Sequence, residues 1–493
     1  MKKLFIYIST LVVISLLCVS NLKVNAAYNY TPDMDEIASA ESLVAMKSVD
    51  SSNLVDVNGN LISSEYTFGS LYDVADDEEN IYICDGSNNV VVVLDHNYNY
   101  VTRFPNGDTT LKNPQGLYVT KEFIYVCDFG NNRVAIFNKN YELVQEVLTP
   151  TDKVFEKYEF RPKKITVSRT GRMYVVAEGV NEGILDFNKD GTFSRFYGMN
   201  QATLSAWDAF WQLFTSEEQK KSQGYNFGAS LLNLCIDEDE YVYTVSSPNV
   251  GTNFIKRLNY KASDVLNRNG YVPNDGDVVS ENLTPGSRVP IESSTFVDID
   301  VNSDGTYIAL DKTRGRIFAY DFEGNLLYEA GSLATAVDGV SSNQNKLFQL
   351  PEALCYFKDK ILTVDSKNKN LIIFEFTDFG KLVNEATHLY KNNEYDAAAK
   401  IWEQVLELNS NYLLAYAGIG KAQFRQGNYE EALKNLKLGN DLYNYSQAYK
   451  QYRYEKLSVV APYILGVVLA GCIALLVRSF VKNANTAEKE GEI

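Results

Sequence analysis

The side chains with the clearest chemical potential in this chain are carboxylates that recur at one position of a repeated motif. Asp85, Asp128, Glu178, Asp311 and Asp365 each end a short apolar run. Converging carboxylates would suit a divalent cation or acid–base chemistry. Because the residue type returns in copy after copy, we interpret these carboxylates as structural. We therefore expect no catalytic residue, no cofactor site and no metal site among them.

Two further acidic segments imitate the start of a calcium loop, namely Asp300-x-Asn302-x-Asp304-Gly305 and Asp186-x-Asn188-x-Asp190-Gly191. In the first segment, Asp311 takes the twelfth position, where a calcium loop carries its closing carboxylate. Asp, Asn and Gly also suit tight hairpin turns. Both segments fall where such turns are expected, so we predict turn chemistry, with calcium binding as the alternative.

Composition excludes several other classes of chemistry. The net charge is −17, with no basic stripe, which argues against nucleic acid as a partner. The chain has 2 histidines and 6 cysteines, and it shows no Gly-rich phosphate loop and no CxxC motif. We expect Cys84, Cys127, Cys235 and Cys355 to be buried free thiols. The few cysteines, with many Asn, Lys and Tyr, suggest an AT-rich Gram-positive bacterium.

The recurring carboxylates belong to a repeated strand–turn–strand segment. Residues 81–85 (IYICD) are followed by 88–95, and residues 124–128 (IYVCD) by 131–138, 43 positions further on. Self-similarity at such a period indicates a repeat architecture. Weaker copies begin near residues 171, 241, 305 and 360.

Each copy, with its opening and return strands, holds about four strands, as a propeller blade requires. Six copies predict an all-β six-bladed propeller over residues 52–380. Residues 52–68 look like half a blade, so we expect them to complete the last blade and close the ring. Closure of this kind leaves few unpaired strand edges.

The copies resemble the NHL repeat, and the best match runs from Pro114 to Phe137. The resemblance covers about residues 70–376 and implies the propeller fold. Six-bladed propellers of this kind include lyases and metal-dependent lactonases related to gluconolactonase. No lactonase ligand set can be carried over residue by residue, so a metal-dependent hydrolase or lyase stays an alternative and we expect no enzyme.

An aromatic insertion interrupts the propeller at residues 202–222. Trp207, Phe210, Trp211 and Phe214 fall at helical spacing on one stripe. The stripe either packs on the propeller or forms a docking surface for a ligand or partner. We take these four residues as the candidate ligand surface.

Helical periodicity replaces the strand pattern in residues 381–456. Tyr395 and Tyr429 lie 34 residues apart, as do Ala398 and Ala432. This pattern resembles the tetratricopeptide repeat, in which small residues let paired helices approach closely. We expect two such units, packed through these four residues.

Apolar segments stand at both ends of the chain. Residues 1–26 read as a secretory signal peptide, with small residues before a cleavage point after Ala26, and residues 27–51 as an irregular or short helical lead-in. Residues 457–478 are long enough to cross a bilayer, with 479–493 as a tail. We expect a single-pass cell-membrane protein with its N-terminal part outside and its tail in the cytoplasm.

These elements together predict a membrane-anchored extracytoplasmic binding or scaffold protein. The combination resembles an uncharacterised Gram-positive NHL-repeat family. That resemblance implies a membrane protein complex, such as a sugar-transporter permease, as partner of the tetratricopeptide module. A carbohydrate or cell-wall receptor is the alternative within the binding class.

Overall fold

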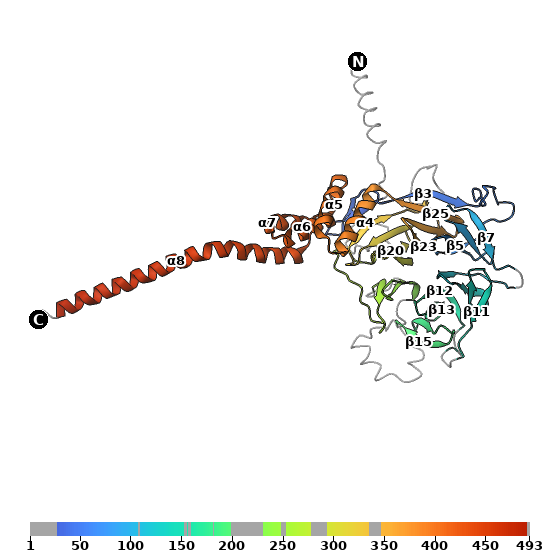
Figure 1. Cartoon of the computed structure of the whole chain (residues 1–493), viewed down its shortest axis with the longest axis horizontal. Coiled ribbons are helices and arrows are strands. Elements are labelled where there is room, and N and C mark those ends of the chain that lie inside the picture. The colour runs from blue at the N-terminus through green and yellow to red at the C-terminus, as the bar shows by residue number, and fades with distance from the viewer. Residues whose placement is uncertain are drawn as a thin grey trace, which may run out of the picture. The chain divides into compact units, whose positions relative to one another are not determined.

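The computed structural model describes residues 27–106, 109–151, 155, 159–180, 182–198, 230–247, 253–277, 293–334 and 347–490. The chain divides into two compact units, Met1–Asn384 and Glu385–Ile493. The first is a β-propeller and the second is helical (Figure 1). The predicted insertion at 202–222 lies outside the described residues.

The propeller contains six separate antiparallel sheets, and each opens with a strand at the centre of the ring. Blades one to three are β4 (Leu71–Asp76), β5 (Asn80–Asp85), β6 (Val90–Asp95), β7 (Tyr100–Phe104); β8 (Gly116–Val119), β9 (Phe123–Asp128), β10 (Arg133–Asn138), β11 (Leu143–Val147); and β12 (Arg161–Val167), β13 (Met173–Glu178), β14 (Ile184–Phe187), β15 (Phe193–Tyr197). Blades four to six are β16 (Leu231–Ile236), β17 (Val242–Ser246), β18 (Ile255–Leu258); β19 (Phe296–Val301), β20 (Tyr307–Asp311), β21 (Arg316–Tyr320), β22 (Leu326–Ala330); and β23 (Pro351–Phe357), β24 (Lys360–Asp365), β25 (Asn370–Phe376), β3 (Leu43–Asp50).

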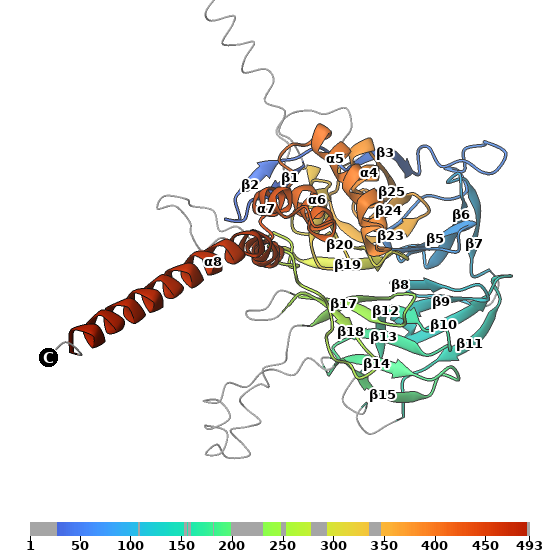
Figure 2. The same cartoon turned by 60° about the vertical axis from the view of Figure 1, so that its left-hand side comes forward.

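The opening strands form a closed ring in the order β4, β8, β12, β16, β19, β23 and back to β4. Figure 2 shows the first three blades fanned side by side. The predicted six-bladed propeller is therefore confirmed. The second strands of the blades, such as β5, β9 and β20, are almost wholly buried because both faces of a blade pack against neighbouring blades.

The ring closes with an N-terminal strand, but not the predicted one. β3 pairs with β25, so that Leu371 lies opposite Val49. The assignment of 52–68 as the closing strand was wrong. Those residues fold instead around a tight turn in which Asp56 accepts hydrogen bonds from the backbone of Asn58 and Asn60.

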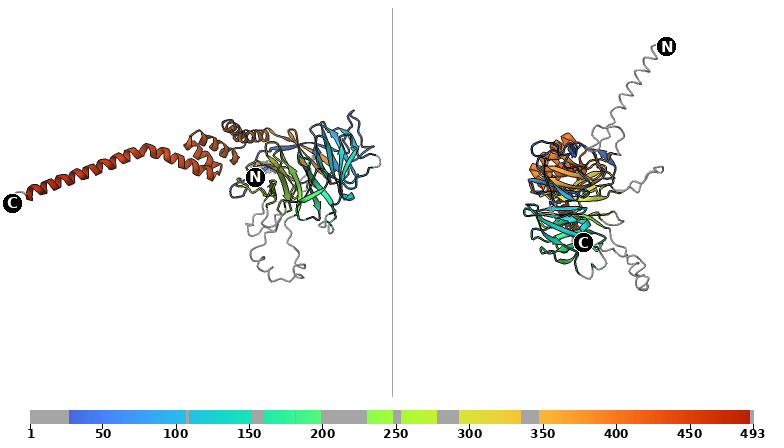
Figure 3. Two further views of the ribbon diagram at one scale, coloured as in Figure 1. Left: turned by 60° about the horizontal axis from the view of Figure 1, so that its bottom comes forward. Right: turned by 90° about the vertical axis from the view of Figure 1, so that its right-hand side faces the viewer.

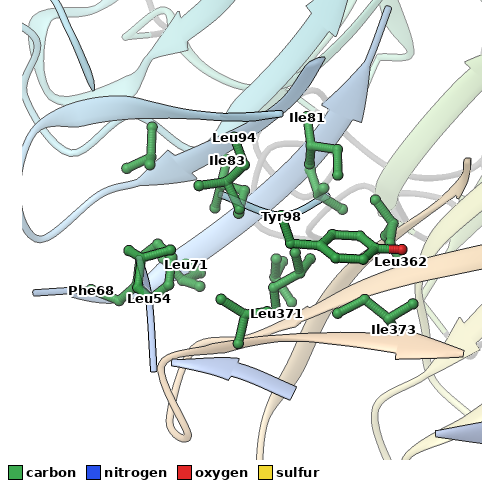
Figure 4. Close-up of a cluster of buried hydrophobic side chains, with 14 of the residues drawn as sticks. Leu54, Phe68, Leu71, Ile81, Ile83, Leu94, Tyr98, Leu362, Leu371 and Ile373 are labelled. Atoms are coloured by element: carbon green, nitrogen blue, oxygen red, sulfur yellow. The ribbon is translucent and has the colours of Figure 1, made fainter. Parts of the chain in front are cut away.

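Residues 52–68 still belong to the core between blades six and one. Leu54 and Phe68 join a buried cluster with Leu71 of β4 and Leu371 of β25 (Figure 4). The lead-in was also predicted wrongly, because β1 (Tyr28–Tyr30) and β2 (Glu36–Ala38) form a two-stranded sheet. All three residues of β1 are buried, the tyrosines and Asn29 alike.

The helical region consists of α4 (Asp378–Lys391), α5 (Tyr395–Leu408), α6 (Leu413–Arg425), α7 (Tyr429–Leu438) and α8 (Leu442–Glu490). The same aromatic contact returns at a 34-residue interval. Tyr390 packs edge-on against Tyr395, and Phe424 packs against Tyr429. The hairpins α4–α5 and α6–α7 therefore repeat the same packing along the chain.

Small residues set the spacing of these helices. Ala398 and Ala432 are 1% and 0% exposed. A Cβ added to Gly420 of α6 would lie 2.7 Å from Leu436 Cγ of α7. Close helix approach therefore depends on these positions, as the sequence predicted for the two alanines, while Tyr395 and Tyr429 are half-buried at the hairpin turns.

The last helix, α8, runs as one ribbon from the helical hairpins to the apolar segment (Figure 3). Within it, Leu442–Lys482 is the one helix of the described chain long and apolar enough to cross a membrane, and its most apolar 18 residues have a mean hydropathy of 2.5. The side chains of the apolar stretch are exposed throughout. This helix is compatible with a single-pass membrane anchor.

Candidate functional site

The channel of the propeller is lined by one equivalent residue from each opening strand. On five of these strands a β-bulge precedes the residue, so the registers define the set. Gly116 takes the same place on β8, opposite Cys127. The six positions are occupied by Asp73, Gly116, Lys164, Asn233, Asp298 and Ala353. We call this set the channel ring.

A buried ion pair spans blades one and three. Lys164 Nζ lies 2.8 Å from Asp73 Oδ1, and it also donates to the Tyr72 carbonyl. The other Asp73 oxygen accepts the Leu117 backbone N–H at 2.7 Å. Blade two carries glycine in the ring, and a Cβ at Gly116 would lie 2.2 Å from the Lys163 carbonyl oxygen. The absent side chain lets strand β12 approach.

The opposite side of the channel ring is joined by Asp298. Asn233 Nδ2 donates to Asp298 Oδ1 at 2.5 Å, and the other Asp298 oxygen accepts the Leu354 N–H at 2.7 Å. These bonds connect blades four, five and six. The channel ring is thus a network of buried polar groups that holds the blades together at the axis.

Two buried carboxylates share one cation in this ring. Although burial disfavours a charged amine, the carboxylates of Asp73 and Asp298 raise the pKa of Lys164 above its usual value. Burial raises the pKa of Asp298, and the Lys164 ammonium only partly opposes this. Burial likewise raises the pKa of Asp300, one layer further along β19, to about 7.

Sequence analysis did not single out the channel ring, because the residue type at this position changes between copies and returns only as aspartate in blades one and five. A usable signal was the polar residue at the place of Gly116 in the Pro114-x-Gly116 motif. Four of the five recurring carboxylates, by contrast, accept backbone hydrogen bonds from the segments that lead into their blades, namely Asp85, Asp128, Asp311 and Asp365. Asp85 accepts the Gly69 N–H at 2.7 Å, and Asp365 accepts the Gln349 N–H at 2.6 Å, so both tie blade turns to the incoming chain. Glu178 differs, because it pairs with Lys163 at the surface.

The calcium-like segments also use their side chains inside the fold. Asn302 Oδ1 accepts the backbone N–H groups of Asp304 and Thr306, which is the geometry of an Asx turn. Asp300 accepts the Tyr356 N–H and so joins blades five and six. Over the described part of the chain, no group of three or more His, Cys, Asp or Glu side chains is arranged to hold a metal ion.

An open cleft of about 1170 Å³ lies at one end of the propeller, over blades one to three. Its walls are the hairpin turns that follow β4, β8 and β12. The aromatic residues in these walls are Tyr82, Tyr118, Phe123, Tyr125 and Tyr141. The turns held by the recurring carboxylates follow the second strand of each blade, so they lie at the other end of the propeller.

A half-buried ion pair stands between blades one and two in the cleft. Lys139 Nζ lies 2.6 Å from Asp77 Oδ2, which also accepts the Tyr82 hydroxyl at 2.8 Å. Lys139 Nζ is 5.1 Å from the centre of the Tyr82 ring. Burial alone would raise the pKa of Asp77, but hydrogen bonds from Lys139, the Asn80 backbone and Tyr82 outweigh it and lower that pKa. The cleft therefore offers charged hydrogen-bonding groups beside aromatic faces.

The predicted ligand surface, Trp207, Phe210, Trp211 and Phe214, falls outside the described residues, so its relation to the cleft is not defined. The four predicted free thiols are placed as such, with Cys84, Cys127 and Cys355 buried and Cys235 half-buried. Burial raises the pKa of Cys84 well above its ordinary value.

Comparison with known families identifies one matching model, the NHL repeat, at residues 111–137. This match confirms the predicted resemblance of the second copy. A search of curated proteins finds none with significant similarity to this chain.

Solved structures with a similar propeller include two lyases. Virginiamycin B lyase from Staphylococcus aureus is 13% identical, with a TM-score of 0.39, over 62% of this chain and 95% of its own. A streptogramin B lyase is 14% identical, with a TM-score of 0.40, over 64% and 95%. A protein of unknown function from Bacteroides thetaiotaomicron is 15% identical, with a TM-score of 0.42, over 70% and 80%.

Proposed function

We propose that this chain is a membrane-anchored extracytoplasmic binding protein whose propeller takes a carbohydrate ligand in the cleft over blades one to three. The cleft is the observation that supports this proposal. It combines several aromatic walls with the Asp77–Lys139 pair, whose groups match the hydroxyls of a sugar as acceptor and donor. Its volume of about 1170 Å³ would accommodate more than one sugar ring.

The helical hairpins serve in this proposal as a docking module for a membrane protein. Their 34-residue interval and their small packing residues agree with tetratricopeptide repeats, which present a concave surface to a partner segment. α8 continues from them into the apolar segment without a break. The sequence resemblance to proteins associated with sugar transporters makes a permease the partner class to test.

Glycan retention on an immobilised cell-wall polysaccharide tests the ligand-binding role. Lys139→Met should weaken retention by about tenfold, because a charged hydrogen bond contributes about 1.5–3 kcal/mol. Lys360→Met is the matched control, since Lys360 also pairs with a carboxylate, Glu375 at 2.7 Å, and lies 5.9 Å from the Tyr98 ring. Equal retention by both variants would contradict the cleft as the ligand site.

Crosslinked purification from membranes tests the docking role separately. Deletion of residues 383–456, with 457–493 kept as anchor, should release the membrane partner. Trp207→Ala with Trp211→Ala should leave that partner bound, and weaken glycan retention if the aromatic insertion belongs to the ligand surface. Retention of every co-purifying membrane protein after the deletion would contradict the docking role.

A further inference from the structure

The first described residues are bound by a buried, charged cluster on blade five. Ala27, Tyr28 and Tyr30 are 5%, 7% and 5% exposed. Strand β1 packs beside β22, and the Tyr271 hydroxyl donates to the Tyr30 carbonyl at 2.9 Å. A segment this close to the start of a domain is usually poorly ordered unless something ties it down.

Asp277 binds the side chains of this segment. Its Oδ1 accepts the hydroxyls of both Tyr28 and Tyr30, the latter at 2.6 Å. Its Oδ2 lies 2.8 Å from an Arg314 guanidinium nitrogen and 3.5 Å from one of Arg316. The Arg316 guanidinium also lies over the Tyr28 ring, 4.4 Å from its centre.

Glu329 also binds this segment, but only one of its two carboxylate oxygens has a hydrogen-bond partner among the described residues. Oε1 accepts the Tyr28 backbone N–H at 2.7 Å. Oε2 is buried and has no hydrogen-bond partner among the described residues, and the Arg316 Nε atom is 3.8 Å away. The residue is 1% exposed, and burial raises its pKa to about 8. A carboxylate oxygen buried without a partner is costly, so a missing donor is expected.

The charges of the cluster leave room for one more cation. Asp277 and Glu329 face the guanidiniums of Arg314 and Arg316. Glu36 of β2 adds a third negative charge that acts on Glu329 and Arg316. Two buried carboxylates thus face two guanidinium groups, and the exposed Glu36 adds negative charge from outside the cluster.

We propose that proteolytic removal of residues 1–26 creates a free ammonium group on Ala27 that becomes the hydrogen-bonding partner of Glu329. The sequence places the cleavage point after Ala26. Consecutive residues are about 3.8 Å apart, so the Ala27 nitrogen starts within one residue of the Tyr28 N–H that already contacts Glu329. An ammonium group has three donors, whereas the uncut peptide nitrogen has one.

The cleavage is a hydrolysis that needs only water and a leader-removing protease. The C–N bond between Ala26 and Ala27 breaks, the Ala26 carbonyl carbon gains the hydroxyl, and the Ala27 nitrogen gains the other proton of the water. The new carboxylic acid then releases its proton and the amine takes one up, which leaves a carboxylate on Ala26 and an ammonium group on Ala27. The residues after the bond, Ala27 and Tyr28, are buried in the folded propeller. The protease must therefore act before β1 docks, and docking then follows cleavage.

The test uses the full chain with its leader, purified from membranes in detergent. N-terminal sequencing should give Ala27 as the first residue. The α-amino group should react with an amine reagent about tenfold more slowly than in Glu329→Gln, as expected if the carboxylate raises the pKa of the amine by about one unit. A different first residue, or equal labelling rates, would overturn the proposal.

A glycine inserted between Ala26 and Ala27 provides a variant that keeps Glu329. Sequencing must show that the inserted glycine is the first residue. The insertion should lower the melting temperature of the wild-type background and restore rapid labelling, yet change neither quantity in the Glu329→Gln background. An equal loss in both backgrounds would show that the ammonium does not act through Glu329.

Discussion

Lys164 Nζ lies 2.8 Å from Asp73 Oδ1, and this contact connects blades one and three past the glycine of blade two. Both side chains are nearly inaccessible, at 11% and 8% exposure. A buried pair adds little net stability over an apolar replacement, but loss of one partner strands the other charge. Replacing Lys164 and Asp73 together should therefore destabilise the propeller less than replacing Lys164 alone.

Lys164→Met should destabilise the propeller by about 3–5 kcal/mol, because Asp73 and Asp298 then lose their shared cation. Adding Asp73→Leu should recover much of that loss. Chemical denaturation of the full chain, followed by tyrosine fluorescence, measures both changes. A single variant as stable as the wild type would contradict the structural role of the channel ring.

Ring closure by β3 can be tested within that strand. Val49 is 2% exposed and lies opposite Leu371, whereas Met46 on the same strand is 52% exposed. Val49→Asp buries an unpaired charge and should lower the melting temperature strongly. Met46→Asp is the control and should have a small effect. Similar melting temperatures for the two variants would argue against this pairing.

The stability of the propeller should fall as pH rises from about 4 to about 7 through Asp300. Its folded pKa is raised to about 7 by burial, above the roughly 3.9 of an unfolded chain, so the folded state holds the proton more tightly. The stabilisation of the folded state by the Asp300 proton is complete below about pH 4 and is lost as pH passes about 7. Across this window the melting temperature of the wild type should fall with rising pH. The melting temperature of Asp300→Asn should change less, because this variant lacks the titrating carboxyl group. A wild-type slope unchanged by Asp300→Asn would contradict the assignment.

Overpacking should unfold the helical unit selectively. Ala432 is 0% exposed in α7, so Ala432→Leu should cost about 1–3 kcal/mol. Glu430→Leu on the same helix is exposed and serves as control. Helical circular dichroism should show an earlier transition only for Ala432→Leu, with the strand signal of the propeller unchanged. Simultaneous loss of both signals would mean that the units unfold together.

The repeated residues of this chain were readable from the sequence because each copy repeats the same physical problem. Asp85 and Asp128 accept backbone hydrogen bonds at equivalent places in two blades, so their role could be inferred from recurrence. The channel ring could not be inferred in this way, since Asp73, Gly116 and Lys164 solve one problem jointly with different side chains. Their partnership exists only once the blades meet at the axis.

The closing strand was missed for a related reason. β3 has no copy of the repeat motif, and a bulge opposite Ile373 and Phe374 breaks its alternation. The neighbouring residues 61–68 carry more aromatic side chains and so resemble a strand, although they serve as packing between two blades. Pairing with β25 is a long-range choice that local pattern does not encode.

Closure by β3 also imposes an order on biosynthesis. Ser48 and its hydrogen-bond partner Asn370 are 322 residues apart, and the ribosome makes Ser48 first. β3 therefore waits, with an unpaired edge, until five blades and most of the sixth have been synthesised. A strand edge that waits this long is open to pairing with the wrong chain. The last contact of the ring to form therefore pairs one of the first strands made with one of the last, and the ring can close only once β25 has been synthesised.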